Sequence, residues 1–182
     1  MSVKTDKQIC KQAWGYAKDV VAGKIVVCNN IKLSCQHALD MKKRKDITFD
    51  ENAAARPIRF ANFLNHLKGP KAGEPIELES WQMFLVSQIY GWMRPDGLRL
   101  RRSVYIEVPR KSGKSTLCSV LSLYHLIADS ESSAEIYSAA TSRDQARIVF
   151  GDAQAMVRAS KHLSQHLTVH RSSISHQATN SK

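Results

Sequence analysis

A short loop of small and basic residues constrains the fold of this chain more than any other feature. The loop, Pro109–Thr116, reads PRKSGKST; it follows the apolar, β-rich run Val104–Val108 and precedes a stretch with apolar residues at helical spacing, Leu117–Ile127. A strand, a glycine-containing loop and a helix in this order are typical of a phosphate-binding loop. Backbone N–H groups at such a helix start point toward the loop, where the helix dipole favours negative charge. The pattern therefore predicts an α/β domain that binds nucleotide phosphates.

Single residues of this loop have distinct expected roles. Lys114 would reach the β- and γ-phosphates, and the Ser115 hydroxyl would coordinate Mg²⁺. The loop departs from the usual G-x-x-x-x-G-K-[ST] pattern, because Val108 stands where the first glycine is expected. The alternative interpretation is a plain helix start with a solvated lysine. The preceding strand and two further cations, Arg110 and Lys111, favour nucleotide binding over that alternative.

The residues after the loop continue the alternation of strands and helices. Glu135–Ala140 is a second β-rich run, and Ser142 with Gln145 three residues later predicts the start of a long capped helix. This order implies parallel strands with right-handed crossovers, hence an α/β fold with a partial parallel sheet flanked by helices. Short apolar positions within Leu167–Ile174 predict a hairpin. Because two parallel strands and a hairpin make a small sheet, we expect residues 74–182 to be the first half of an α/β domain that contains the phosphate loop.

Residues 1–73 are expected to form a helical lead-in. Its first helix is predicted to begin at a capping box made by Thr5 and Gln8 and to end at Gly23. Further helices of this region are expected over residues 31–42 and 56–68, and a helix over residues 81–92 is expected beyond it. The glycine- and proline-rich stretch Lys68–Pro75 has loop chemistry, so the boundary between the two regions is predicted within it.

The composition indicates a globular, basic chain. Lysine and arginine total 27 against 16 aspartate and glutamate residues, and the net charge of +11 suits a polyanionic partner. The candidates for contacting such a polyanion are three arginines just ahead of the loop, Arg99, Arg101 and Arg102. No stretch reaches the roughly 18 apolar residues of a membrane span, and the polar start indicates no secretion signal. The four cysteines form no C-x-x-C pair, which argues against a disulfide scaffold or a zinc module.

Three histidines recur every four residues near the end of the chain. His162, His166 and His170 would align on a helix and could form a metal site. The helical periodicity fades after Ser160, however, and no acidic or cysteine partner is near in sequence. Solvated surface histidines are therefore the preferred interpretation.

Several segments together resemble one protein family. Leu78–Phe84 reads LESWQMF, Tyr90–Trp92 reads YGW, and Ile106–Ser115 reads IEVPRKSGKS. These segments resemble the large subunit of tailed-bacteriophage terminases, whose members carry a tryptophan–glutamine pair about thirty residues ahead of a deviant phosphate loop. Ala139–Ala146 is similar to the next strand-to-helix junction of the same ATPase. The resemblance covers nearly the whole chain and is strongest over residues 78–150.

The resemblance implies an ATP-driven motor that pumps phage DNA into a procapsid and carries a C-terminal nuclease. Gln82 would hydrogen-bond adenine, Trp81 would pack against the base or hold its helix, and Arg110 would contact the γ-phosphate in cis. Lys114 and Arg110 are the expected catalytic residues, and Ser115 the expected Mg²⁺ ligand. The expected ATP-binding residues are Trp81, Gln82, Pro109, Arg110, Lys111, Ser112, Gly113, Lys114, Ser115 and Thr116.

The resemblance also implies a set of partners and a location. The expected cofactors are ATP and Mg²⁺. The expected partners are double-stranded DNA, the small terminase subunit, the portal protein and, for a full-length protein, further copies of itself, with no membrane. The implied location is the cytoplasm of an infected bacterium.

The residues needed for ATP hydrolysis are less evident. Hydrolysis needs an acidic pair at the end of an apolar strand, to hold Mg²⁺ and to activate water. The acids after the loop, none of which follows an apolar run, are Asp129, Glu131, Glu135, Asp144 and Asp152. We therefore expect an N-terminal fragment that binds ATP without efficient turnover and lacks the nuclease. Two alternatives stay open: another phosphate-loop NTPase of helicase-like type, and a non-catalytic remnant that binds DNA or a protein partner.

Overall fold

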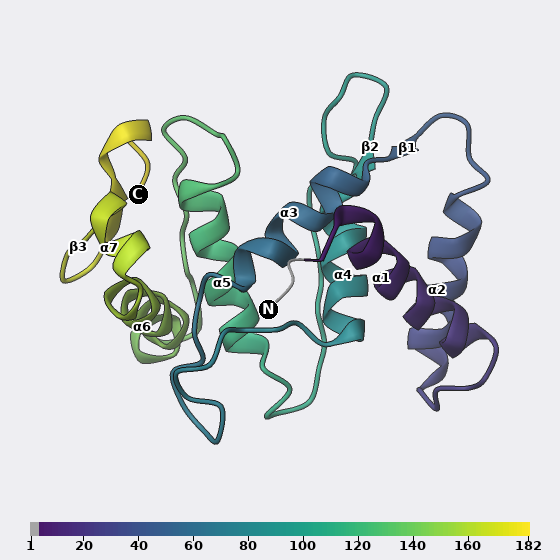
Figure 1. Cartoon of the computed structure of the whole chain (residues 1–182), viewed down its shortest axis with the longest axis horizontal. Helices are drawn as coiled ribbons and strands as arrows, with labels where there is room; N and C mark the ends of the chain where they lie inside the picture. The colour runs from purple at the N-terminus through teal and green to yellow at the C-terminus, as the bar shows by residue number, and fades with distance from the viewer. Residues whose placement is uncertain (1–3) are drawn as a thin grey trace. The chain divides into compact units, whose positions relative to one another are not determined.

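The computed structural model describes residues 4–182, which form two compact units (Figure 1). The first unit comprises the described residues up to Arg59 together with Leu78–Tyr105. The second comprises Phe60–Glu77 and Ile106–Lys182. Each unit is therefore built from two segments that are distant in sequence. The expected domain division near residue 73 remains a prediction.

Four helices dominate the first unit. They are α1 (Asp6–Val21), α2 (Asn29–Met41), α3 (Glu51–Ala61) and α4 (Ser80–Tyr90). Two short strands, β1 (Thr48–Phe49) before α3 and β2 (Trp92–Met93) after α4, pair with each other in antiparallel orientation. The capping box predicted for α1 is confirmed. The Gln8 backbone N–H donates to the Thr5 hydroxyl oxygen, and the Thr5 backbone N–H donates to the Gln8 side-chain oxygen. The helix predicted from Trp81 is likewise confirmed as α4.

An aromatic cluster forms the core of the first unit. The ring of Trp14 on α1 lies 5.1 Å from that of Phe49, 6.2 Å from that of Trp92 and 6.3 Å from that of Phe84, all edge to face. Such pairs stabilise a core beyond their buried area. A Cβ atom at Gly91 would lie 2.5 Å from the Phe49 ring, so glycine is needed where this ring meets the backbone. The cluster thereby packs α1 and α4 against the β1–β2 pair.

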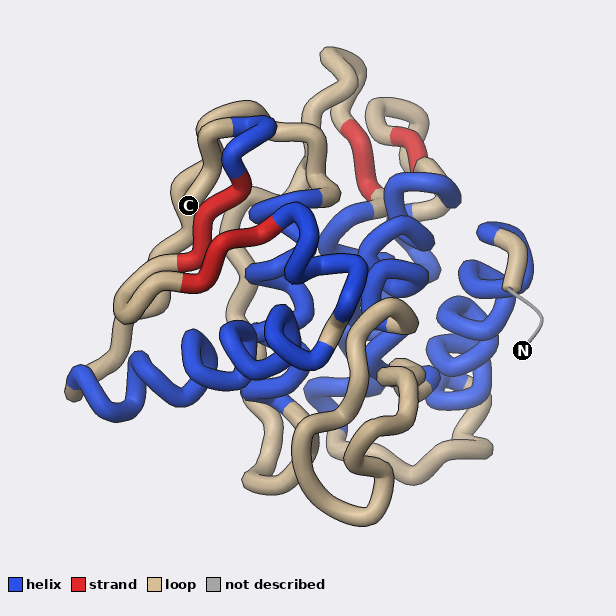
Figure 2. Tube along the Cα trace, turned by 60° about the vertical axis from the view of Figure 1, so that its left-hand side comes forward, coloured by secondary structure: helices blue, strands red, loops and turns tan. Residues whose placement is uncertain are grey.

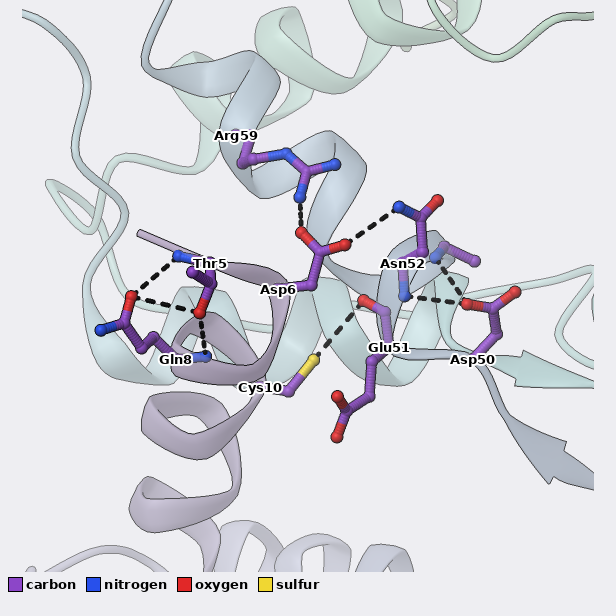
Figure 3. A network of polar contacts seen from close by, with 9 residues as sticks. Thr5, Asp6, Gln8, Cys10, Asp50, Glu51, Asn52 and Arg59 are labelled. Carbon is purple, nitrogen blue, oxygen red and sulfur yellow. Dashed lines mark hydrogen bonds and ion pairs between the residues drawn. The ribbon is translucent and has the colours of Figure 1, made fainter. Parts of the chain in front are cut away.

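A polar network joins the starts of α1 and α3 (Figure 3). The Asp6 carboxylate forms an ion pair with Arg59 and accepts a hydrogen bond from Asn52 Nδ2 at 2.9 Å. The Cys10 thiol donates to the carbonyl oxygen of Glu51 at 3.6 Å, and burial is the main cause that raises the pKa of this thiol to about 11. These contacts fix α3 against the first turns of α1.

The helix expected over residues 56–68 begins and ends earlier in the structure. The helix that forms here is α3, Glu51–Ala61. Asp50 starts it, because its Oδ1 accepts from the backbone N–H groups of Asn52 at 2.8 Å and Ala53 at 3.0 Å. Pro57 therefore lies inside the helix rather than at its first turn. Phe63, inside the expected range, lies beyond the end of α3 and is 66% exposed.

The second unit contains the loop and the helices after it. It holds α5 (Lys114–Ile127), α6 (Arg143–Ala159), α7 (Lys161–His166), β3 (Leu167–Val169), β4 (Ile174–His176) and the 3₁₀ turn η1 (Gln177–Thr179). Helix α5 packs on α6, with Val120 and Leu123 of α5 and Met156 and Val157 of α6 buried. The cap predicted at Ser142 is confirmed, since its hydroxyl accepts from the N–H of Gln145. The predicted hairpin is confirmed as the antiparallel β3–β4 pair.

The expected parallel sheet does not form within residues 4–182. The strands there are two short antiparallel pairs, drawn in red in Figure 2. The runs 104–108 and 135–140 have no regular secondary structure and belong to no strand ladder. A strand requires a neighbour for its N–H and C=O groups, and Val104, Ile106 and Val108 make no backbone hydrogen bond to any described residue. The β-rich runs and the helices thus alternate along the chain as expected, but the two runs do not pair into the expected sheet.

Within the part of the chain that the structure describes, no helix combines the length and the apolar character needed to cross a bilayer.

The cap of α3 can be tested by a single substitution. Asp50→Ala should lower the free energy of unfolding by about 1 kcal/mol, because two backbone N–H groups lose their acceptor. Urea denaturation measures the change. Asp46→Ala is the matched control, since Asp46 pairs only with Arg44 at an exposed position and surface pairs contribute little. Equal losses in the two variants would contradict the assignment of Asp50 as the cap.

Candidate nucleotide-binding site

The phosphate loop turns sharply before α5. Lys111 has a φ of 66° and Gly113 a φ of 73°, so two residues of the loop lie in the left-handed region. Glycine adopts this conformation freely, whereas a lysine there carries backbone strain of a kind that gathers at functional sites. Left-handed residues within a turn direct neighbouring N–H groups to one side, which forms a concave site for anions.

The start of α5 has no side-chain cap. Gly113 is the N-cap residue, and its carbonyl oxygen accepts from the N–H of Leu117 at 2.9 Å. The N–H groups of Lys114, Ser115 and Thr116 meet no acceptor among the described residues. A helix start of this kind carries a partial positive charge and three donors. It can therefore hold a phosphate without rearranging.

The side chains of the loop add positive charge to the same place. Arg110, Lys111 and Lys114 are exposed, and none of them forms an ion pair with a residue of the described chain. Ser112, Ser115 and Thr116 are half-buried, with hydroxyl groups beside the helix start. The structure thus brings together the residues from Pro109 to Thr116 that the sequence predicts as a phosphate site.

A buried serine anchors the loop helix. The Ser119 hydroxyl, fully buried, lies 2.9 Å from the Ser115 carbonyl oxygen and 2.8 Å from that of Val149 on α6. Its single hydrogen is shared between the two acceptors. Beside it, burial raises the pKa of the Cys118 thiol, and the nearby charge of Lys114 opposes this shift. Ser119 therefore joins the first turn of α5 to α6.

Trp81 and Gln82 lie on α4, in the first unit. Trp81 is half-buried, and Gln82 is 9% exposed. The Oε1 atom of Gln82 accepts from the backbone N–H of Glu79 at 2.9 Å, and the Glu79 side chain accepts from the backbone N–H of Gln82. The predicted adenine-binding residue is therefore also half of a capping box. The spacing of Glu79 and Gln82 is the signal that could have revealed this role from the sequence.

One expected polyanion contact is instead part of the packing. Arg101 donates from Nε to the carbonyl oxygen of Gln88 at 3.0 Å and contacts the sulfur of Met41. The Gln88 side chain in turn accepts from the Trp92 indole at 2.8 Å. Burial lowers the pKa of Arg101. Its guanidinium group thus holds the end of α4, a role that the sequence analysis missed.

The three histidines do not gather into a metal site. His162 and His166 lie on α7, whereas His170 lies in the hairpin loop, with Nε2 at 3.2 Å from the Ser175 hydroxyl. Over residues 4–182, no group of three His, Cys, Asp or Glu side chains is placed to hold a metal ion.

A comparison with protein families identifies the group to which the chain is related. The family model described as the terminase large subunit, ATPase domain, matches residues 80–181. The chain belongs to the terminase large subunit family. The match includes α4 with Trp81 and Gln82, the phosphate loop, and the helices that follow it. The resemblance drawn from the sequence motifs is therefore confirmed.

A solved structure supports the same assignment. The chain is similar to the crystal structure of the HK97 bacteriophage large terminase, with 26% sequence identity and a TM-score of 0.60. The match covers 70% of this chain and 26% of the HK97 chain, so the present chain corresponds to about a quarter of that terminase. A search of curated proteins gave no match.

The anchor of the loop helix can be tested with two serines of α5. Ser119→Ala should lower the free energy of unfolding by about 1 kcal/mol more than Ser122→Ala does, because only Ser119 makes the buried hydrogen bond. Both substitutions replace serine by alanine in the same helix, so the change in helix propensity cancels. Thermal and urea denaturation measure the difference, and equal stabilities would show that the bond contributes nothing.

Proposed function

We propose that this chain binds Mg·ATP through the loop Pro109–Thr116, as the nucleotide-binding part of a phage DNA-packaging motor. The start of α5 is the observation that supports this most directly. It combines unsatisfied N–H groups, two left-handed loop residues and exposed cations that have no acidic partner among the described residues. Such a site suits the polyphosphate of a nucleotide better than a single weak anion.

Each loop residue has a role in this proposal. The Lys114 ammonium group is set against the β- and γ-phosphates, and Arg110 against the charge that develops on the γ-phosphate. Ser115 offers a hydroxyl oxygen, the kind of ligand that Mg²⁺ accepts alongside phosphate oxygens. When bound, the ion neutralises phosphate charge. Pro109, Lys111, Ser112, Gly113 and Thr116 complete the loop around the phosphates.

The proposed base contacts come from α4. Gln82 keeps its Nε2 donor after its Oε1 has accepted from Glu79, and that donor suits a purine ring nitrogen. The amide orientation follows from the hydrogen bond, since only the oxygen can accept from a backbone N–H. Trp81, next to it, would pack against the base or hold the helix. Adenine recognition by these two residues remains a proposal.

We further propose that ATP turnover by this chain alone is slow. Several acids after the loop are held by other groups: Asp129 by His125 at 2.8 Å, Asp152 by Lys68 at 3.2 Å, and Glu135 by the Tyr137 hydroxyl at 2.6 Å. None of the three lies at the end of a described strand. An acid that activates water must instead face the γ-phosphate.

The partners follow from the family and stand as proposals. Double-stranded DNA, a small terminase subunit, a portal protein and further copies of the large subunit would surround a complete motor in the bacterial cytoplasm. The charge of +11 favours the DNA contact in particular. The same charge supports a second candidate function, a basic module that binds DNA or a protein without using nucleotide. Family membership weakens the case for a helicase-like enzyme.

A titration of Mg·ATP tests the proposal directly. Calorimetry on the full chain should show one binding event, and Lys114→Ala should weaken it at least about tenfold, because a charge-assisted contact to phosphate is lost. Lys161→Ala is the matched control, an exposed lysine at the start of α7. Phosphate release, followed in the same samples, should stay near the background rate.

The outcomes separate the candidate functions. Unchanged ATP affinity in Lys114→Ala would show that the loop is not the phosphate site. Turnover that depends on Lys114 would show that one of the acids set aside here is catalytic. DNA binding that weakens with salt, ignores ATP and survives Lys114→Ala would favour the non-catalytic module.

Two substitutions of Gln82 separate its structural role from base recognition. Gln82→Glu retains an oxygen that accepts from the Glu79 N–H but removes the Nε2 donor, so ATP affinity should fall while the free energy of unfolding stays near that of the wild type. Gln82→Ala should lose both, at a cost of about 1 kcal/mol in stability. ATP and GTP titrations with urea denaturation measure the two effects. Wild-type ATP affinity in Gln82→Glu would contradict the adenine contact.

A further inference from the structure

Four lysines gather on one side of the first unit, where α1 lies against α2. Lys7, Lys11 and Lys18 are exposed residues of α1, and their spacing places them within about 40° of one another around the helix axis. Lys42, which follows α2, holds its ammonium group over the Trp14 ring of α1, 3.5 Å from the ring centroid. We name Lys7, Lys11, Lys18 and Lys42 the α1 lysine face.

The charge of this face is not neutralised by the protein. None of the four lysines forms an ion pair with a residue of the described chain. The two acids of α1 beside them in sequence have other partners, since Asp6 pairs with Arg59 and Asp19 with Lys24. The face therefore presents its positive charge to the surroundings.

The four charges also repel one another. Lys7 and Lys11 are i, i+4 neighbours, which destabilises a helix when the charges are alike. Lys7 lies in the first turn, where the helix dipole disfavours a cation. Burial is the main cause that lowers the pKa of Lys42, and the charge of Lys18 lowers it further, against that of Glu51. A polyanion bound here would relieve this repulsion.

The shape of the face favours a duplex over a single strand. Lys7 and Lys18 stand about 17 Å apart along a straight helix, and a duplex holds about one phosphate charge per 1.7 Å of its axis in fixed positions. Single strands bind largely by stacking their bases on exposed aromatic rings. Trp14, the aromatic residue beside the lysines, is 6% exposed and lies under Lys42.

The amide side chains of α1 are not available to read bases. Gln8 Oε1 accepts from the backbone N–H of Thr5 at 2.8 Å. Gln12 Oε1 accepts from the Lys4 ammonium group at 2.9 Å, and its Nε2 donates to the Ser80 hydroxyl at 3.1 Å. Lysines that act as point charges contact phosphates without identifying the sequence.

We propose that the α1 lysine face binds the phosphate backbone of double-stranded DNA without regard to sequence. The row on α1 would follow one line of phosphates, and Lys42 would add a charge beside it. The inference rests on the DNA partner proposed above, and it assigns that partner to the first unit. It does not depend on ATP binding at the phosphate loop.

The salt dependence of DNA binding to the full chain tests this proposal. The probe is a fluorescein-labelled duplex of mixed sequence, about 20 base pairs long, and fluorescence anisotropy measures its affinity at about 50 to 200 mM salt. The double variant Lys11→Gln with Lys18→Gln should bind about tenfold more weakly. Its plot of log affinity against log salt should be shallower by about two, because each neutralised phosphate contributes about 0.9 to the slope.

A second double variant controls for the loss of net charge. Lys71→Gln with Lys161→Gln removes two exposed lysines outside the face, so the slope should stay at the wild-type value. Circular dichroism confirms that each variant is folded. Both double variants should bind Mg·ATP as the wild type does, so a failure of the DNA site and a failure of the phosphate loop are observed separately.

Three results would overturn the proposal. The first is no binding of the duplex to the folded wild-type chain at about 50 mM salt. The second is an equal change of affinity and slope in the two double variants, which would indicate only general attraction to a basic protein. The third is tighter binding of polyglutamate than of a duplex with the same number of charges, which would make the face a site for an acidic protein.

Discussion

The start of α5 leaves its first N–H groups without an acceptor among the described residues, and the rest of the helix compensates for this. Helices α1, α6 and α7 begin at side-chain caps from Thr5, Ser142 and Ser160, each of which satisfies a backbone donor. Helix α5 lacks such a cap and so forgoes about 1 kcal/mol of local stability. A cap there would compete with phosphate for the same donors.

The stability that α5 lacks at its start comes from its other residues. Ser119 ties the first turn to α6, and Leu117, Val120, Leu123 and Tyr124 are buried along one stripe. The loop can then retain an exposed helix start and a left-handed Lys111, because the body of the helix is held by packing. The packing of residues one and two turns further along α5 thus offsets the lower stability of the helix start.

Gln82 illustrates how a structural role can support a proposed one. The capping box with Glu79 stabilises the start of α4 and fixes the amide in one orientation. A fixed amide presents its remaining donor without the loss of rotamer entropy that a mobile glutamine would suffer on binding. The structural role therefore supports the proposed contact with a base rather than competing with it.

Signals between residues close in sequence predicted most of the helices. Features that depend on residues far apart in sequence, such as strand pairing, were not predicted correctly. The caps at Thr5 and Ser142 act within four residues, so the sequence alone identifies them. The helix expected over residues 56–68 instead begins at Glu51, because Asp50 provides the cap.

The runs at 104–108 and 135–140 have strand composition, but a ladder depends on neighbours that residue types alone do not reveal. The loop from Pro109 to Thr116 could be proposed as a phosphate site from the sequence because a strand-like run, a glycine and a helix are adjacent in the chain. The packing of Arg101 joins residues far apart in sequence, and no local pattern announces it.

The aromatic cluster has a spectroscopic consequence. All three tryptophans of the chain, Trp14, Trp81 and Trp92, belong to the first unit, and the second unit has only Tyr124 and Tyr137 as comparable fluorophores. Tryptophan emission therefore reports on the unit that contains Gln82 and is insensitive to unfolding confined to the unit with the phosphate loop. Comparing the emission with far-ultraviolet circular dichroism, to which the helices of both units contribute, would reveal whether the two units unfold together or one after the other.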